Sequence, residues 1–228
     1  MDLIYRGKTK DVYRNEDGDT VLYFKDDMTG KDGVFDPGEN QVGLTVEGSG
    51  EAGLKMTSFF FEKFNAENIP THYIDADAEA REMRVKEISV FGEGLEVICR
   101  YRAVGSFIRR YGDYIEEGGE LPAYVETTLK DDERGDPLIN EAALEALGIL
   151  QPGEYKKVVD LTVKISGLIK DELAQKGLEL YDIKLEFGRD LKTGEILLID
   201  ELSGGNMRVF KAGEAVDPLK IGEYLFSE

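Results

Sequence analysis

Residues 178–200, LELYDIKLEFGRDLKTGEILLID, combine two apolar segments with a short polar segment between them. The first apolar segment alternates with charged residues, whereas the second holds four apolar residues in a row before Asp200. Alternation is typical of a strand with one face in a core, and an apolar run is typical of a strand buried on both faces. Because the GRDLKTG segment between them is rich in turn-forming residues, we predict an antiparallel hairpin.

One face of the first strand of this hairpin is fully charged, with Asp182, Lys184 and Glu186 at alternate positions. By itself, such a face is typical of a sheet surface in contact with solvent. The apolar partner strand weakens that interpretation, because acids at the mouth of a buried strand pair are costly unless another group compensates their charge. A Mg²⁺ ion that holds a polyphosphate is a suitable group, since Mg²⁺ binds one or two carboxylates together with phosphate oxygens.

Short strands are also predicted in the first half of the chain. A hairpin turns at residues 15–18, and a second pair of strands flanks the glycines at residues 92–94. Residues 30–53 contain many glycines, which suggests ordered loops or a mobile flap rather than regular structure.

Three helices are predicted from periodicity and end signals. The first lies within residues 54–69, carries phenylalanines at helical spacing and ends before Pro70. Asn140 is a suitable N-cap for a second, short helix, and the third, residues 154–176, ends at Gly177. This order of strands and helices predicts an α+β fold with a mostly antiparallel sheet.

The composition excludes several classes of function. The chain of 228 residues is 41% hydrophobic, and its 28 basic and 47 acidic residues give a net charge of −19, which repels nucleic acid and anionic membranes. No apolar run approaches the ~20 residues that span a bilayer, and the N-terminus lacks the apolar core of a signal peptide. Cys99 and His72 are single residues of their types, which excludes an intramolecular disulfide and a multi-histidine metal site. We therefore expect a cytoplasmic globular protein whose partners are small molecules.

A basic segment, EVICRYRAVGSFIRRYG at residues 96–112, stands out in so acidic a chain. Arg100 and Arg102 lie two residues apart on a predicted strand and should point the same way, and Ser106 precedes Arg109 and Arg110. Guanidinium groups beside a Gly-Ser turn suit the recognition of phosphate or carboxylate. Pairing of these arginines with neighbouring surface acids is equally consistent with the sequence.

Two further segments are weaker signals. Lys8 and Lys10 in YRGKTKDVY could meet nucleotide phosphates, although this segment is neither a P-loop nor a dinucleotide-binding fingerprint. RGDPLINE, residues 134–141, contains Asp136 but by itself is typical of a simple helix start.

Six segments in this order resemble the SAICAR synthetase family, the phosphoribosylaminoimidazole-succinocarboxamide synthases of purine biosynthesis. The segments are YRGKTKDVY, NIPTHY, EVICRYRAVGSFIRRYG, GDPLINE, LYDIKLEFG and IDELS followed by Arg208. The resemblance covers nearly the whole chain and implies a SAICAR synthase-like α+β fold. In that fold a β-rich N-terminal lobe, residues 1–84, binds nucleotide and faces a larger C-terminal lobe, residues 85–228, with an antiparallel sheet, helices and the substrate and metal sites. ATP is expected in the cleft between the lobes.

The resemblance also implies a reaction. A member of the family uses ATP and Mg²⁺ to activate the carboxylate of carboxyaminoimidazole ribonucleotide (CAIR), with an acyl phosphate as the expected intermediate. The amine of L-aspartate then displaces phosphate, which gives SAICAR, ADP and phosphate. The protein contributes mainly positioning and charge neutralisation. The sequence does not give the oligomeric state, and a homo-oligomer is one alternative.

Residue roles follow from the matching motifs of the family. Catalysis is expected from Asp182, Lys184 and Arg208, and these residues are expected to bind the substrate together with Arg102 and Ser106. The nucleotide is expected to contact Lys8, Lys10, Lys86, Glu186 and Asp200. The metal is expected at Asp136 and Asp200.

One segment departs from the family pattern near the predicted site. After IDELS the family usually continues Pro-Asp-x-Ser-Arg, whereas this chain has Gly204, Gly205, Asn206 and Met207 before Arg208. An acid that touches substrate in the family is therefore missing at Gly205. The departure leaves two alternatives, a paralogue that ligates a related carboxylate or another amine, and a nucleotide-binding module without ligase activity.

Overall fold

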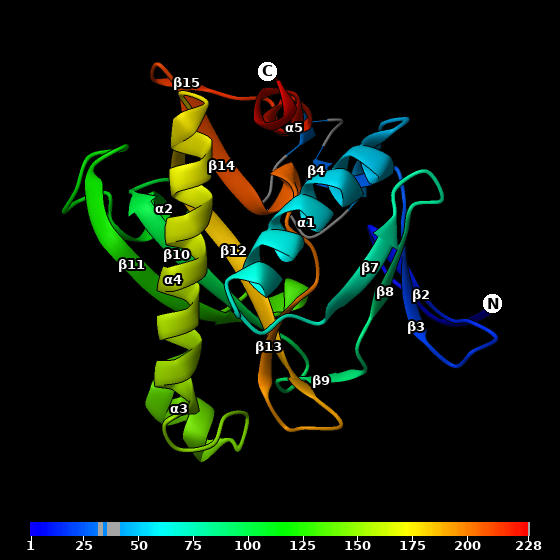
Figure 1. Ribbon diagram of the computed structural model, residues 1–228. Helices are drawn as coiled ribbons and strands as arrows, with labels where there is room; N and C mark the ends of the chain where they lie inside the picture. The colour runs from blue at the N-terminus through cyan, green and yellow to red at the C-terminus, as the bar shows by residue number, and fades with distance from the viewer. Residues whose placement is uncertain (32–33, 36–41, 228) are drawn as a thin grey trace.

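The computed structural model describes residues 1–31, 34–35 and 42–227 (Figure 1). Within these ranges the chain forms five α-helices and three antiparallel sheets, of five, seven and three strands. The prediction of an α+β fold with mostly antiparallel pairing is confirmed. None of the described helices is long and apolar enough to cross a membrane.

The five-stranded sheet is built from the N-terminal part of the chain, in the order β1-β2-β3-β8-β7. Its strands are β1 (Asp2–Arg6), β2 (Lys10–Arg14), β3 (Thr20–Phe24), β7 (Tyr73–Asp77) and β8 (Glu82–Val85). β2 and β3 form the predicted hairpin, in which Lys10 lies opposite Phe24. Asn15 fixes the turn, because its side chain accepts a hydrogen bond from Asp19 N at 2.7 Å. Lys10 is therefore held at the end of the hairpin away from the turn.

The seven-stranded sheet follows the order β11-β10-β12-β14-β15, and β13 and β9 also pair with β12. Its strands are β9 (Ile88–Val90), β10 (Leu95–Arg102), β11 (Glu120–Leu129), β12 (Glu179–Asp190), β13 (Ile196–Ile199), β14 (Met207–Lys211) and β15 (Glu214–Ala215). β12 and β13 form the hairpin predicted from residues 178–200, with Phe187 opposite Leu198. All four residues of β13 are buried, as the apolar run predicted.

The strands that flank residues 92–94 do not pair with each other, so the predicted second pair is wrong. β9 pairs with the end of β12, where Val90 lies opposite Gly188. β10 pairs with β11 on one side and with β12 on the other. The reason is the length of β12, which offers backbone partners to both β9 and β10 and replaces the local pairing that the turn suggested.

Residues 30–53 contain more regular structure than their glycine content predicted. A three-stranded sheet consists of β4 (Asp27–Lys31), β5 (Val34–Phe35) and β6 (Val42–Thr45), in the order β5-β4-β6. The glycines serve close packing here, because a Cβ on Gly43 would lie 2.3 Å from the carbonyl carbon of Gly30. The first helix begins at Ser49 rather than near residue 54. The rest of the predicted flap, residues 32–33 and 36–41, lies outside the described residues.

Five α-helices complete the fold (Figure 1). They are α1 (Ser49–Ala66), α2 (Ser106–Tyr111), α3 (Glu141–Ala146), α4 (Glu154–Gln175) and α5 (Pro218–Phe226), and two short 3₁₀ segments are η1 (Asp132–Arg134) and η2 (Gly204–Asn206). Asn140 caps α3 as predicted, accepting a hydrogen bond from Ala143 N at 3.0 Å. α4 crosses one face of the seven-stranded sheet and buries Ile165 and Leu173 against it.

α1 carries the aromatic residues of the core. Phe60, Phe61 and Phe64 are at most 1% exposed, and full burial of such a side chain contributes about 1.5–3 kcal/mol. The same buried cluster reaches Met83 of β8 and Leu185 of β12. Both large sheets therefore share one core, and the predicted division into lobes at residues 1–84 and 85–228 stays a prediction.

Candidate active site

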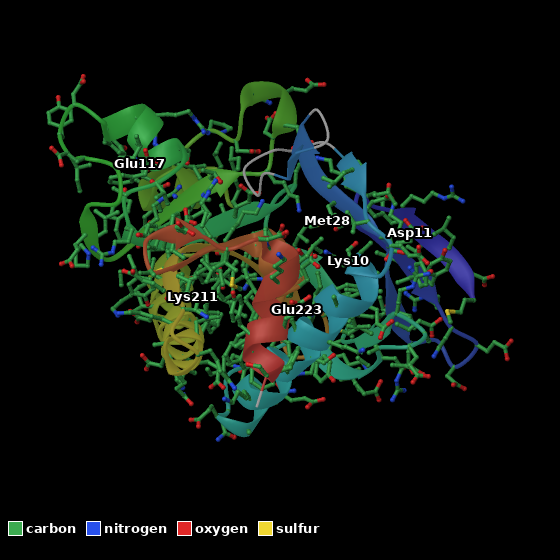
Figure 2. All side chains as sticks on the ribbon, turned by 90° about the horizontal axis from the view of Figure 1, so that it is seen from above. Lys10, Asp11, Met28, Glu117, Lys211 and Glu223 are labelled. Carbon is green, nitrogen blue, oxygen red and sulfur yellow. The ribbon has the colours of Figure 1, made fainter. Side chains whose placement is uncertain are left out.

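Two cavities lie on the charged side of the seven-stranded sheet. The larger, about 900 Å³, lies between this sheet and the N-terminal sheet and is within the usual size of small-molecule sites. Its walls include Lys10 of β2, Glu186 of β12 and Leu219 of α5. In the view from above, Lys10 lies between the N-terminal strands and α5, which carries Glu223 (Figure 2). The smaller cavity, about 290 Å³, is lined by charged residues of β10, β12 and β14.

The two cavities meet at Asp132, Lys184 and Asn206, which line both of them. β12 also contributes Asp182 to the smaller cavity and Glu186 to the larger one. The charged face of this strand therefore runs along both cavities. Because Asp182 is only 3% exposed, the interpretation of this face as an ordinary solvated sheet surface is wrong.

Lys10 links the N-terminal sheet to two acids at the end of β13. Its Nζ lies 3.1 Å from Asp200 Oδ1 and 3.0 Å from Glu201 Oε1. Burial opposes the charged form of Lys10, but the two carboxylates outweigh burial and raise the pKa of Lys10. Burial also opposes the charged form of Asp200, whose pKa is nevertheless lowered to about 2 by Lys10 and Lys130. Lys10 and Asp200 are therefore both charged at neutral pH.

Asp200 has a backbone conformation that is uncommon for a residue with a side chain, with a φ of 65°. His72 supports it, because His72 Nε2 lies 3.2 Å from the Asp200 carbonyl oxygen and His72 N donates to Leu198 O at 3.0 Å. Burial lowers the pKa of His72 to about 4, so the ring is neutral and Nε2–H can donate to this carbonyl. Strained residues held by such contacts cluster at functional sites.

A second ion pair in the larger cavity joins Lys130 Nζ to Glu186 Oε1 at 2.7 Å. Burial, together with the nearby charge of Asp200, raises the pKa of Glu186. The carboxylates of Glu186 and Asp200 therefore repel each other, and further positive charge beside them would stabilise the charged form of both. Lys8 pairs with Asp132 where the two cavities meet.

Three neighbouring strands place charged residues side by side in the smaller cavity. Arg100 of β10 and Arg208 of β14 both lie opposite Asp182 of β12. Both guanidinium groups contact Asp182 Oδ2, that of Arg208 at 2.8 Å. Burial raises the pKa of Asp182, and the two arginines oppose that shift. Arg100 also donates to Ser106 Oγ and to Glu126 Oε1, each at 2.8 Å, so its orientation is fixed from several sides.

Gly105 allows Arg208 to approach the turn before α2. It has a φ of 57°, and a Cβ at this position would lie 2.9 Å from the Arg208 guanidinium group. Arg109 and Arg110 of α2 also line the smaller cavity. This cavity therefore presents several guanidinium groups beside a Gly-Ser turn, an arrangement that suits a ligand with carboxylate or phosphate groups.

Comparison with known proteins identifies a family over nearly the whole chain. The profile of the SAICAR synthetase family matches residues 3–220. The chain is 61% identical over 221 residues to the phosphoribosylaminoimidazole-succinocarboxamide synthase of Clostridium tetani, and the match covers 97% of both chains. The chain belongs to the SAICAR synthetase family.

Solved structures of the family share this fold. The structure is similar to that of the phosphoribosylaminoimidazole-succinocarboxamide synthase of Ehrlichia chaffeensis, with a TM-score of 0.84 and 26% identity over 99% of this chain and 92% of that chain. It is also similar to a SAICAR synthetase in complex with ADP, with a TM-score of 0.84 and 30% identity over 98% of this chain and 97% of that chain.

Most residues that were predicted from the SAICAR synthetase motifs line one of the two cavities. The larger cavity is lined by Lys8, Lys10, Lys184, Glu186 and Asp200. The smaller cavity is lined by Ser106, Asp136, Asp182, Lys184 and Arg208. The chain thus brings together residues that are far apart in sequence, and their chemical roles stay predictions.

Arg102 and Lys86 are not among the residues that line these two cavities. The expectation that Arg100 and Arg102 serve one site from the same face is wrong, because the β10–β11 pairing shifts register between them. Arg102 instead pairs with Glu179 at 2.7 Å, and Arg100 reaches the smaller cavity. Lys86 Nζ donates to the carbonyl oxygen of Thr71 at 2.9 Å.

Several cavity residues received no role from the motifs of the family. They are Glu96, Arg100, Lys130, Asp132, Glu201 and Asn206. Alternation along β10 could have predicted that Glu96 and Arg100 share one face of the strand. In the structure, Glu96 pairs with Lys184 at 2.7 Å. Lys130 and Asp132 lie outside the strands, where no periodicity predicts the direction of a side chain.

The predicted metal ligands Asp136 and Asp200 line different cavities, and their role in holding a metal stays a prediction. Among the described residues, no group of three or more His, Cys, Asp or Glu side chains is placed to hold a metal ion. Mg²⁺ needs only one or two carboxylates when phosphate oxygens complete its coordination. Asp200 and Glu186, which both line the larger cavity and repel each other, meet that requirement.

Proposed function

We propose that this chain joins L-aspartate to the carboxylate of CAIR at the expense of ATP, releasing SAICAR, ADP and phosphate in purine biosynthesis. The observation that carries the proposal is the position of Lys184, which lines both cavities. A ligase of this kind must bring a nucleotide and a carboxylate within reach of each other, and two cavities that meet at one lysine allow that. The relative at 61% identity bears the name of this enzyme.

The larger cavity is the proposed ATP site. Leu22 and Met56 give it an apolar wall that suits a base, and Lys8 and Lys10 give it positive charge that suits phosphates. A relative of similar fold is described in complex with ADP. The proposed metal is Mg²⁺, held by Asp200 and Glu186 together with nucleotide phosphates. When bound, Mg²⁺ neutralises the charge that develops on those phosphates.

The smaller cavity is the proposed site of CAIR, with L-aspartate beside it. Arg100 and Arg208 supply charge for anionic groups, and Ser106 supplies a hydroxyl group. The buried Asp182 is a positioning residue in this scheme, because it orients both guanidinium groups.

The reaction proceeds in two steps. A carboxylate oxygen of CAIR bonds to the γ-phosphorus of ATP as the bond to ADP breaks, and ADP takes the electron pair. The aspartate nitrogen then bonds to the acyl carbon, loses a proton, and phosphate leaves with the electron pair of the C–O bond. Lys184 neutralises negative charge where the two cavities meet. The enzyme must also keep water from the activated acyl group.

A second candidate function rests on the segment at residues 204–207. Gly205 stands where the family usually has an acid that touches substrate, so a paralogue acting on a related carboxylate or another amine is the alternative ligase. A nucleotide-binding module without ligase activity is the third candidate function. The cytoplasm is the proposed compartment, and the oligomeric state is open.

One assay separates these functions. The protein is incubated with ATP, Mg²⁺, CAIR and L-aspartate, and ADP release and the new amide are followed by mass spectrometry. We expect SAICAR at an ordinary enzymatic rate. Turnover only after a change of carboxylate or amine would indicate the paralogue, and ADP binding without turnover on any substrate would indicate the binding module.

A further inference from the structure

Asn206 lies at the junction of the two cavities, in the segment that departs from the family pattern. It ends the short 3₁₀ segment η2, and its Oδ1 accepts hydrogen bonds from Ser203 N at 3.0 Å and from Ser203 Oγ at 3.3 Å. A backbone N–H can only donate, so this contact fixes which end of the carboxamide is the oxygen.

The NH₂ group of Asn206 consequently points away from Ser203. Within the described part of the chain, both hydrogen bonds of the side chain are made by Oδ1, and the residue is half-buried and lines both cavities. The two N–H donors therefore belong to a side chain that lies where the cavities meet. They carry no net charge and are not taken up by an ion pair.

The cationic groups nearby are already engaged with acids. Lys184 lies 2.7 Å from Glu96, and Arg208 lies 2.8 Å from Asp182. A fixed neutral donor beside these pairs favours an oxygen that gains negative charge, and it is less strongly hydrated than a free ammonium group would be.

We propose that Asn206 is a catalytic residue whose Nδ2–H donates a hydrogen bond to an oxygen of the phosphoryl group as it passes from ATP to the substrate carboxylate. The inference rests on the proposed function and adds a residue to it. No proton leaves Asn206: the P–O bond to ADP breaks, the bond to the carboxylate oxygen forms, and the hydrogen bond stabilises the charge on the phosphoryl oxygens. This contact belongs at the junction, because the phosphoryl group passes there from ATP in the larger cavity to the substrate carboxylate in the smaller cavity.

The test compares Asn206→Asp with Asn206→Ala. Asp keeps the oxygen that accepts from Ser203 but replaces the donor with a negative oxygen, whereas Ala removes both. We expect kcat to fall by about 100-fold or more for Asn206→Ala, since loss of one such donor typically costs about 10²–10³, and further for Asn206→Asp, because the new charge adds repulsion. The affinity for ADP, which lacks the transferred phosphoryl group, should stay close to the wild-type value.

A purely structural role for the turn predicts the opposite order. In that case Asn206→Asp, which preserves the turn, would be nearly as active as wild type, and Asn206→Ala would be the slower and less heat-stable variant. That result would overturn the inference, as would a raised KM for CAIR or L-aspartate with an unchanged kcat, which would place the contact on a ground-state carboxylate.

The matched control is Asn140→Asp, the same chemical change at the N-cap of α3. Asn140 is not among the residues that line either cavity, so its variant should keep wild-type kcat. A loss of kcat in Asn140→Asp equal to that in Asn206→Asp would overturn the inference. Wild-type protein that binds ADP but shows no turnover would overturn the proposed function itself, and the inference with it.

Discussion

Lys10 Nζ lies 3.1 Å from Asp200 Oδ1, and this contact joins the first hairpin of the N-terminal sheet to the end of a buried strand of the seven-stranded sheet. Glu201 is a second carboxylate partner for Lys10, at 3.0 Å. Loss of the charge on Asp200 would therefore leave Lys10 with one carboxylate, and the fold should survive the loss.

We expect Asp200→Asn to lower kcat by at least about 100-fold, because the variant removes a charged oxygen from the proposed Mg²⁺–ATP site. Circular dichroism and the affinity for ADP without metal should show a folded protein. The control is Asp75→Asn, which removes an exposed carboxylate paired with Arg84 in the N-terminal sheet and should leave kcat unchanged. Wild-type activity in Asp200→Asn would remove this residue from the site.

Gly105→Ala should impair the smaller cavity. The added Cβ would lie 2.9 Å from the Arg208 guanidinium group, so Arg208 must move away from Asp182. Because the backbone at Gly105 has a positive φ, the variant should also lose about 1–3 kcal/mol of unfolding free energy. We expect the KM for CAIR to rise at least about 10-fold, measured by steady-state kinetics.

Gly118→Ala is the matched control for this variant. Gly118 also has a positive φ, of 78°, but a Cβ there would meet nothing within 4 Å. The two variants should therefore lose similar stability in urea unfolding, while only Gly105→Ala should raise the KM for CAIR. Equal kinetic effects in both would show that backbone strain, rather than displacement of Arg208, is responsible.

His72 predicts a pH dependence of stability. Burial lowers the pKa of His72 to about 4 in the folded chain, whereas an exposed histidine has a pKa of about 6.5, so the folded state favours the neutral ring. The contribution is fully present above pH 6.5 and is lost as the pH falls from 6.5 through 4, because the unfolded chain then binds a proton more readily. A difference of about 2.5 pH units corresponds to about 3 kcal/mol.

The measurement is urea unfolding between pH 7 and pH 4, without nucleotide or divalent cation. Carboxyl groups also titrate in this range, so wild type is compared with His72→Gln, which cannot be protonated. The unfolding free energy of wild type should fall more steeply than that of the variant. Parallel pH profiles for the two proteins would contradict a buried, neutral His72.

Cys99 should be unreactive in the native protein. Its side chain is 0% exposed, burial raises the pKa of the thiol, and Ser166 Oγ donates to Sγ at 3.2 Å. We expect no labelling by a thiol reagent over minutes in buffer and complete labelling in urea. Rapid stoichiometric labelling of folded, active protein would show that this part of the sheet opens readily.

The basic segment shows where prediction from the sequence stops. Alternation placed Arg100 and Arg102 on one face of a strand, and this local rule predicts direction only while the register of the ladder is regular. The register shift between them sends Arg102 to Glu179, while Arg100 stays opposite Asp182. The family motif identified the segment, and long-range pairing selected the arginine that lines the cavity.

The strand pair predicted around residues 92–94 failed for a related reason. Local turn residues suggested a hairpin, but β9 and β10 found their partners on β12, which is far away in sequence. In residues 30–53, close packing of Gly30 against Gly43 allowed strands where composition predicted loops.

Periodicity and turn chemistry alone specify the β12–β13 hairpin, the buried character of β13 and the extent of α4, because these features depend on neighbours in the sequence. Tertiary structure alone decides that Lys10 meets Asp200 and that Asn206 lies at the junction of the two cavities. Such contacts depend on strand register and on packing between distant segments, which no local pattern encodes.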